Sequence, residues 1–260
     1  RIYRINFFLS EALPKFGEDM SGSQNTISGS VATIKHYIGE MYFLRAYEYF
    51  KKLQLFGDFP IINQPLADEM EALREASKRF PRNEVARFII SDLDKAYAYM
   101  SDVDMATTRI NKDVAMLVKS RVALFEATWL QNFKGTAFVP GGEGWPGASL
   151  HNNYQYPSGN LDNEVKYFLE QAVEASKLVA DKYKGNLTEN TGVLQQSDDD
   201  PSNPYFDMFA QEDLSDVKEV LLWRQYARGL STHNINAAAG RGNYRIGLTR
   251  GFVQNFLMKD

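Results

Sequence analysis

Hydrophobic residues recur every three or four positions along most of the first 183 residues, which is the spacing of a buried helical face. The first such segment begins at Ile2, and its apolar positions include Ile5 and Leu9. A proline inside a helix removes one backbone hydrogen bond and crowds the preceding turn, so we expect this helix to end at Pro14.

The longest pattern covers residues 31–56 and carries two apolar stripes. A helix that is apolar on two sides packs against neighbours on both of them. Gly57 follows the last periodic position and Pro60 comes soon after, which is the usual order of residues at a helix C-terminus. We therefore predict a helix that ends at residue 56 and lies inside the core.

Three further amphipathic patterns predict helices over residues 83–100, 111–132 and 162–183. Each begins with a residue whose side-chain oxygen can accept a hydrogen bond from a free backbone N–H group of the first turn. These predicted N-caps are Asn83, Asn111 and Asp162.

A repeat is visible among the predicted helices. Residues 39–50 align with residues 115–126, which places Arg45 on Arg121. Each of the two segments opens a unit of helix, loop and second helix. Recurrence of such a unit along the chain indicates tetratricopeptide-like stacking.

Two of the connecting segments are long. Residues 135–160 are rich in glycine, proline and aromatic residues, and residues 185–204 are polar. Long irregular loops in a compact protein are often functional. Residues 219–226 are predicted to form a strand, with Val220, Leu222 and Arg224 on one side. The sequence thus indicates a mostly α fold, a tetratricopeptide-like helical-repeat scaffold with long irregular loops and a few short strands.

Composition and charge limit the possible functions. The 260 residues carry a net charge of −4, and the basic residues form no block that would bind a nucleic acid. No run approaches the roughly 18 apolar residues that a membrane-spanning helix needs. The absence of cysteine excludes disulfides, thiolate metal sites and cysteine nucleophiles.

No cofactor and no metal site is predicted. Zinc sites need ligands at short spacing, whereas the histidines are isolated from one another, at His36, His151 and His233. The three aspartates at residues 198–200 offer oxygen ligands that suit Ca²⁺, but a solvated acidic turn is the favoured interpretation.

Sequence motifs of catalysis are also missing. We find no Gly-x-Ser-x-Gly motif and no phosphate-binding loop. A glycosidase would need two carboxylates held across a cleft, and nothing in the sequence singles out such a pair. We predict that the protein is not an enzyme, with a carbohydrate-active enzyme as the less favoured alternative.

Two groups of side chains are candidates for ligand binding. Trp145, Tyr154 and Tyr156 lie on the loop over residues 135–160, where their rings could stack on sugars or pin the loop to the scaffold. The second group lies in and after the predicted strand, where it could contact a ligand or belong to an ordinary half-buried strand. It consists of Arg224, Tyr226, Arg228, His233 and Asn234.

Two charged residues receive a structural interpretation. Arg45 interrupts an apolar helix, and buried charges are normally paired. We therefore expect Arg45 to bind a carboxylate or loop carbonyl groups such as those of residues 57–58. Asp58 is expected to act as a cap or turn residue.

One stretch of the chain resembles the signature of the SusD/RagB family. Residues 39–60 contain a glutamate, then Phe-Leu-Arg-Ala, an aromatic run, and Phe-Gly-Asp-Phe-Pro at the end. Three other segments are similar to further elements of that family, namely residues 81–96, 119–125 and 255–260.

The resemblance implies a scaffold of tetratricopeptide-like units with a less regular region that carries the binding surface. On this basis we expect a single partial SusD-like domain over residues 1–260. Its helical-repeat part would be residues 1–184, with the inserted loop 135–160, and its irregular, ligand-facing part would be residues 185–260.

The resemblance also implies a surface-exposed, lipid-anchored protein of the outer membrane, with the anchoring cysteine outside this segment. Members of the family present oligosaccharides, or in some cases peptides, to a TonB-dependent, SusC-like transporter. We therefore expect non-catalytic binding of an oligosaccharide or another nutrient and its delivery to such a transporter. The alternative is a helical-repeat protein that binds a peptide or a protein.

Overall fold

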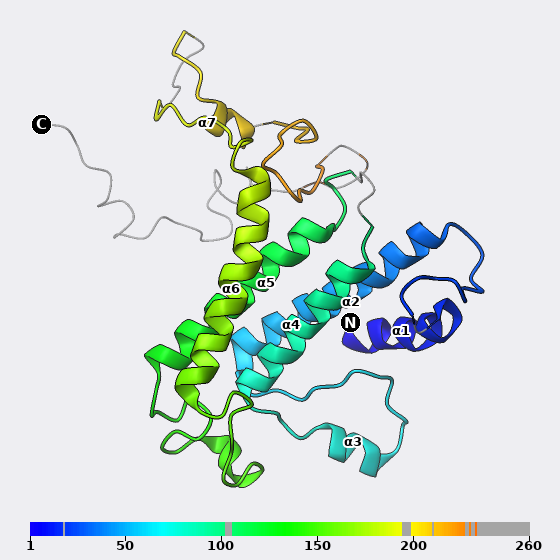
Figure 1. Cartoon of the computed structure of the whole chain (residues 1–260), viewed down its shortest axis with the longest axis vertical. Coiled ribbons are helices and arrows are strands. Elements are labelled where there is room, and N and C mark those ends of the chain that lie inside the picture. Colours follow the sequence, from blue (N-terminus) through cyan, green and yellow to red (C-terminus); the bar gives the residue numbers. More distant parts are fainter. Residues whose placement is uncertain are drawn as a thin grey trace, which may run out of the picture.

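The computed structural model describes residues 1–17, 19–101, 106–193, 199–209 and 211–226, together with residues 229 and 232. Within these residues the chain is mostly α-helical, as predicted (Figure 1). The helices are α1 (Ile2–Phe16), α2 (Val31–Phe56), α3 (Met70–Ala76), α4 (Arg82–Tyr99), α5 (Lys112–Asn132), the 3₁₀ helix η1 (Pro146–Ser149), α6 (Leu161–Tyr183) and α7 (Pro204–Met208). The described residues form no strand, and one isolated β-bridge pairs Phe59 with Phe80.

Four long helices, α2, α4, α5 and α6, lie side by side, each in contact with the next, and α1 packs against α2 (Figure 1). Their facing sides share one hydrophobic core. The members with no exposed surface include Ile38, Ala46, Leu93, Val122 and Phe168. The two apolar stripes of α2 follow from this arrangement, because α2 contacts both α1 and α4. In the part of the chain described, no helix is long and apolar enough to cross a lipid bilayer.

The predicted recurrence of helix pairs is present, with α2 against α4 and α5 against α6. The register of the sequence alignment, however, does not describe equivalent positions. Arg45 is only 4% exposed, whereas Arg121 lies on the exposed side of α5. Amphipathic helices of one period align in several registers, and packing alone selects among them.

Helix α1 continues past Pro14 to Phe16, so the predicted end at the proline is wrong. Pro14 lies in the last turn, where it removes one intrahelical hydrogen bond. Phe16 is fully buried, and the backbone N–H of Gly17 still donates to the Leu13 carbonyl at 3.0 Å. Burial of the aromatic side chain outweighs the single missing hydrogen bond.

The predicted helix caps have mixed outcomes. Asn111 caps α5, since its Oδ1 accepts a hydrogen bond from the backbone N–H of Val114 at 3.1 Å. Asp162 is not the cap of α6, because the helix begins one residue before it. Asn160 takes that role and accepts from the backbone N–H of Asn163 at 2.8 Å.

The strand predicted over residues 219–226 is not formed. The backbone N–H of Trp223 donates to the Thr107 carbonyl at 3.0 Å, and the Leu221 carbonyl accepts from the Asn111 side chain at 2.9 Å. These partners belong to a loop and to a helix cap. No strand of the described residues runs alongside this segment, so it has no partner with which to form a ladder of backbone hydrogen bonds.

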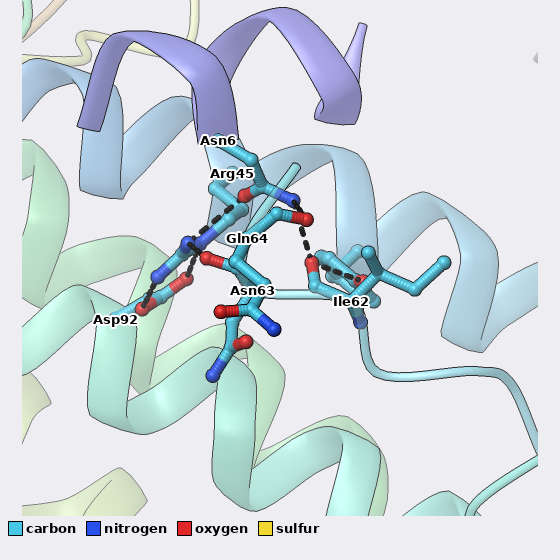
Figure 2. Close-up of polar contacts among 7 residues, drawn as sticks. Asn6, Arg45, Ile62, Asn63, Gln64 and Asp92 are labelled. Atoms are coloured by element: carbon cyan, nitrogen blue, oxygen red, sulfur yellow. Dashed lines mark hydrogen bonds and ion pairs between the residues drawn. The ribbon is translucent and has the colours of Figure 1, made fainter. Parts of the chain in front are cut away.

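Arg45 forms a buried polar cluster that joins α1, α2 and α4 (Figure 2). Its guanidinium donates to both carboxylate oxygens of Asp92, at 2.7 and 2.8 Å. It also donates to Asn6 Oδ1 at 3.0 Å and to the Asn63 carbonyl at 3.1 Å. The structural role predicted for Arg45 is confirmed, although the partners are Asp92 and Asn63 in place of residues 57–58.

Gly39 lies where α2 closely approaches the end of α4. A Cβ atom at this position would lie 2.8 Å from Met100 Cγ, 2.9 Å from the Met100 nitrogen and 3.0 Å from the Ala96 carbonyl oxygen. Two of these atoms are backbone, so the helices would have to separate. We expect Gly39→Ala to lower the free energy of unfolding by about 1–3 kcal/mol, even though alanine favours helices by about 1 kcal/mol.

Urea unfolding of the wild type and of Gly39→Ala measures this effect. Gly185→Ala is the matched control, because no atom lies within 4 Å of a Cβ built at that position. A Gly39→Ala variant as stable as the wild type would show that the two helices are not in close contact here.

Candidate functional site

One concavity lies where the C-terminal end of α2 meets the start of α4, the end of α5 and the loop over residues 133–160. It encloses about 380 Å³. We call it the aromatic cleft. Its lining side chains include Gln54, Phe56, Asp58, Arg79, Arg82, Trp129, Phe138 and Trp145. The loop is the green segment at the lower end of the bundle in Figure 1.

Asp58 joins the three elements that form the floor of the cleft. Its Oδ1 accepts a hydrogen bond from the backbone N–H of Arg82 at 2.9 Å, and its Oδ2 accepts from the indole N–H of Trp145 at 2.8 Å. Burial raises the pKa of Asp58, and the two hydrogen bonds oppose that rise. Asp58 therefore caps α4 from outside the helix, which confirms the role predicted for it. The predicted N-cap, Asn83, lies inside the helix and does not cap it.

Arg82 and Glu126 form a buried ion pair beneath the cleft. The Arg82 guanidinium donates from Nε to Oε1 at 3.0 Å and from Nη2 to Oε2 at 2.9 Å. The guanidinium carbon lies 4.1 Å from the centre of the Trp129 ring. The carboxylate of Glu126 thus neutralises the charge of Arg82, and the Arg82 guanidinium packs against the Trp129 indole.

Glu164 of α6 anchors the far end of the loop. It accepts hydrogen bonds from Asn83 Nδ2 at 3.0 Å, from Arg87 Nε at 2.7 Å and from the Ser158 backbone N–H at 3.1 Å. Burial alone would raise the pKa of Glu164, but these hydrogen bonds bring it below its ordinary value. The loop is therefore tied to α4 and α6 through a charged, buried acceptor.

The structure brings the three predicted loop aromatics together. Trp145 lies 5.6 Å from Tyr154, and Tyr154 lies 5.2 Å from Tyr156, between ring centres. Trp145 is 5% exposed, and a Cβ built on Gly147 would lie 2.2 Å from its ring, so the Gly147 backbone covers one face. The hydroxyls also have partners in the chain, since Tyr154 bonds Asn83 and Tyr156 donates to the Pro140 carbonyl.

Other aromatic side chains present more surface to the cleft. Phe138 is 62% exposed and Phe56 is 47% exposed. Trp129 is half-buried, and its indole N–H donates to the Phe138 carbonyl at 3.1 Å. Sequence reasoning assigned Phe56 and Trp129 to helix core stripes and did not single out Phe138 or Arg79. A usable signal was the position of these rings next to the turns that end α2 and α5.

The second predicted group lies elsewhere. The Arg224 guanidinium lies 5.4 Å from the centre of the Tyr226 ring, and this segment contacts the start of α5 through Asn111. The aromatic cleft lies at the other end of α5, and a helix of 21 residues is about 30 Å long (Figure 1). The two groups therefore do not form one site. The remaining members lie outside the described residues, namely Arg228, His233 and Asn234.

The acidic run at residues 198–200 is placed only in part, because Asp198 lies outside the described residues. Among the residues that the structure describes, no three His, Cys, Asp or Glu side chains gather as metal ligands would.

Residues 18–124 match the model of the SusD-like family 3, described as "Starch-binding associating with outer membrane". A curated relative, SusD-like protein P2 of Formosa agariphila, is 30% identical over 100 residues, which are 38% of this chain and 19% of that protein.

Two solved structures are similar to this chain. A SusD-like protein from Bacteroides fragilis matches 51% of the chain and 23% of its own, with 24% identity and a TM-score of 0.38. A SusD-like carbohydrate binding protein from Bacteroides vulgatus matches 74% of the chain and 31% of its own, with 17% identity and a TM-score of 0.43.

The chain spans less than a third of the length of each of these relatives. The family match includes the whole of residues 39–60, where the sequence resemblance is strongest. On the family model and the curated relative together, residues 18–124 of this chain are similar to SusD-like proteins.

Proposed function

We propose that the aromatic cleft holds an oligosaccharide and that the protein is a non-catalytic carbohydrate-binding protein of the outer membrane. The observation that carries this proposal is the pair of exposed rings, Phe56 and Phe138, beside the polar side chains of Gln54 and Arg79. A sugar stacks its apolar C–H face on an aromatic ring, while its hydroxyls need polar partners. The cleft offers both kinds of contact in one concavity.

The floor of the cleft supports the same proposal, because it is held rigid before any ligand arrives. Asp58 binds both the start of α4 and Trp145, and Arg82 is fixed by Glu126. Binding to a preformed surface loses less conformational entropy than binding that must order a loop.

The description of the matching family supports the ligand class and the location, since it names starch binding and association with the outer membrane. We further propose delivery of the ligand to a TonB-dependent, SusC-like transporter, with a lipid anchor outside this segment. The cleft lies within residues 1–184, whereas residues 185–260 were predicted to face the ligand. Comparison of variants in the two regions separates these possibilities.

Phe138→Ala should weaken oligosaccharide binding about tenfold, because it removes the most exposed ring of the cleft. Isothermal titration against a panel of neutral and charged oligosaccharides measures the effect. Phe209→Ala is the matched control, since Phe209 is 72% exposed and does not line the cleft. Tyr226→Ala tests the second predicted group.

Three outcomes would count against this proposal. Equal losses in Phe138→Ala and Phe209→Ala would remove the cleft as the binding site. Binding of peptides but of no saccharide would favour the alternative ligand class. Release of reducing ends from a polysaccharide would contradict a non-catalytic role.

A further inference from the structure

We propose that the ligand of the aromatic cleft is an anionic oligosaccharide, whose carboxylate or sulfate group binds the guanidinium of Arg79. This inference rests on the function proposed above and names the chemical class of its ligand.

Arg79 brings a positive charge to the cleft that no described carboxylate neutralises. Its side chain is exposed, lines the cleft and forms no ion pair with a described residue. Arg82, the other lining cation, is already paired with Glu126. Lys52 flanks the same region, with its Nζ 5.8 Å from the centre of the Phe56 ring, and it too lacks an ion-pair partner within the described part of the chain.

Asp58 does not cancel this charge. It is the one carboxylate among the described residues that line the cleft. One of its oxygens accepts the backbone N–H of Arg82 and the other accepts the Trp145 indole N–H. Both oxygens therefore face the protein floor, where the donors offset their charge. The side chains at the opening of the aromatic cleft therefore carry a net positive charge, which favours an anionic ligand.

The main chain at Arg79 is held in place on both sides. The Nε2 atom of His151 donates to the Arg79 carbonyl at 2.8 Å. The next residue, Phe80, exchanges two backbone hydrogen bonds with Phe59, both 3.1 Å long. The main chain that carries the Arg79 side chain is therefore held in place next to the exposed rings. Its planar fork can bind a carboxylate or a sulfate through two parallel hydrogen bonds, while the sugar ring lies on phenylalanine.

Pairs of oligosaccharides that differ only in charge test the proposal. One pair is tetragalacturonate and its methyl ester, and the other is a sulfated galactan tetrasaccharide and its desulfated form. We expect the charged member of at least one pair to bind about tenfold more tightly and to lose affinity as salt is added. The pair that shows the difference tells carboxylate from sulfate.

Variants of Arg79 assign the effect to this residue. Arg79→Gln should abolish the preference, so that the charged and neutral members of the pair bind with equal affinity. Arg79→Lys should keep part of the preference, because it keeps the charge and loses the fork. Arg121→Gln is the matched control, since Arg121 is an exposed arginine that does not line the cleft.

Equal affinity for the charged and neutral members, or an unchanged preference in Arg79→Gln, would overturn this inference and leave the proposed function standing. Absence of binding to every saccharide, charged or neutral, would overturn both.

Discussion

Replacement of Asp92 with alanine should lower the free energy of unfolding by about 3–5 kcal/mol, because it leaves the Arg45 guanidinium buried without its counter-charge. Arg45 is 4% exposed, and both of its hydrogen bonds to Asp92 are shorter than 3 Å. Its remaining partners, Asn6 and the Asn63 carbonyl, are neutral and cannot replace the carboxylate. Urea unfolding followed by circular dichroism measures the loss.

Two further variants make this result specific. Glu11→Ala breaks the ion pair with Lys15, in which both side chains are more than half exposed, and should cost less than about 1 kcal/mol. The double variant Arg45→Met with Asp92→Leu removes both buried charges and should recover most of the stability lost in Asp92→Ala. If Asp92→Ala is no less stable than Glu11→Ala, the buried ion pair does not hold α2 to α4.

Replacement of Glu164 with glutamine should cost about 2–3 kcal/mol at neutral pH. The carboxylate accepts hydrogen bonds from Asn83, Arg87 and Ser158, and Arg87 carries a positive charge. A glutamine would turn its NH₂ group toward at least one of these donors. Because Ser158 belongs to the loop, the variant should also loosen the wall of the aromatic cleft and weaken ligand binding.

The pH dependence of this effect has a definite sign. Hydrogen bonds hold the pKa of Glu164 below its ordinary value of 4.5, although burial alone would raise it. The folded state then binds the proton more weakly than the unfolded state. The contribution of Glu164 is fully present above its unfolded-state pKa and is lost as the pH falls through its folded-state pKa.

Melting temperatures of the wild type and Glu164→Gln at a series of pH values test this sign. The difference between them should be largest at neutral pH and should shrink on acidification. Glu170→Gln is the control on the same helix, because Glu170 is 64% exposed and lies 3.8 Å from Lys166. A difference between wild type and Glu164→Gln that does not vary with pH would refute the role given to the ionised carboxylate.

The helices were largely predictable because their signals are local. The apolar period of residues 31–56 and the Gly57 stop fix the bounds of α2, and Asn111 caps α5 as expected. The errors occur where a distant partner decides the outcome. Pro14 does not end α1, because the burial of Phe16 in the core stabilises the last turn of the helix.

The candidate site was less predictable for the same reason. Trp145 is a plausible sugar contact on a proline- and glycine-rich loop, but the fold places its ring against Gly147 and its N–H on Asp58. Phe138, a few residues earlier on the same loop, keeps most of its ring exposed. Composition cannot distinguish these two aromatics, because both belong to the same kind of segment.

The sequence by itself determined the four long helices, the end of α2 and the resemblance to SusD-like proteins, since periodicity, turn residues and a contiguous motif are all readable along the chain. Only the tertiary structure decided which polar and aromatic groups are used within the protein and which are left for a ligand. Asp58 and Trp145 are 87 positions apart and meet because α2, α4 and the loop converge at one end of the bundle. Contacts of that kind depend on how the helices pack, which no local pattern encodes.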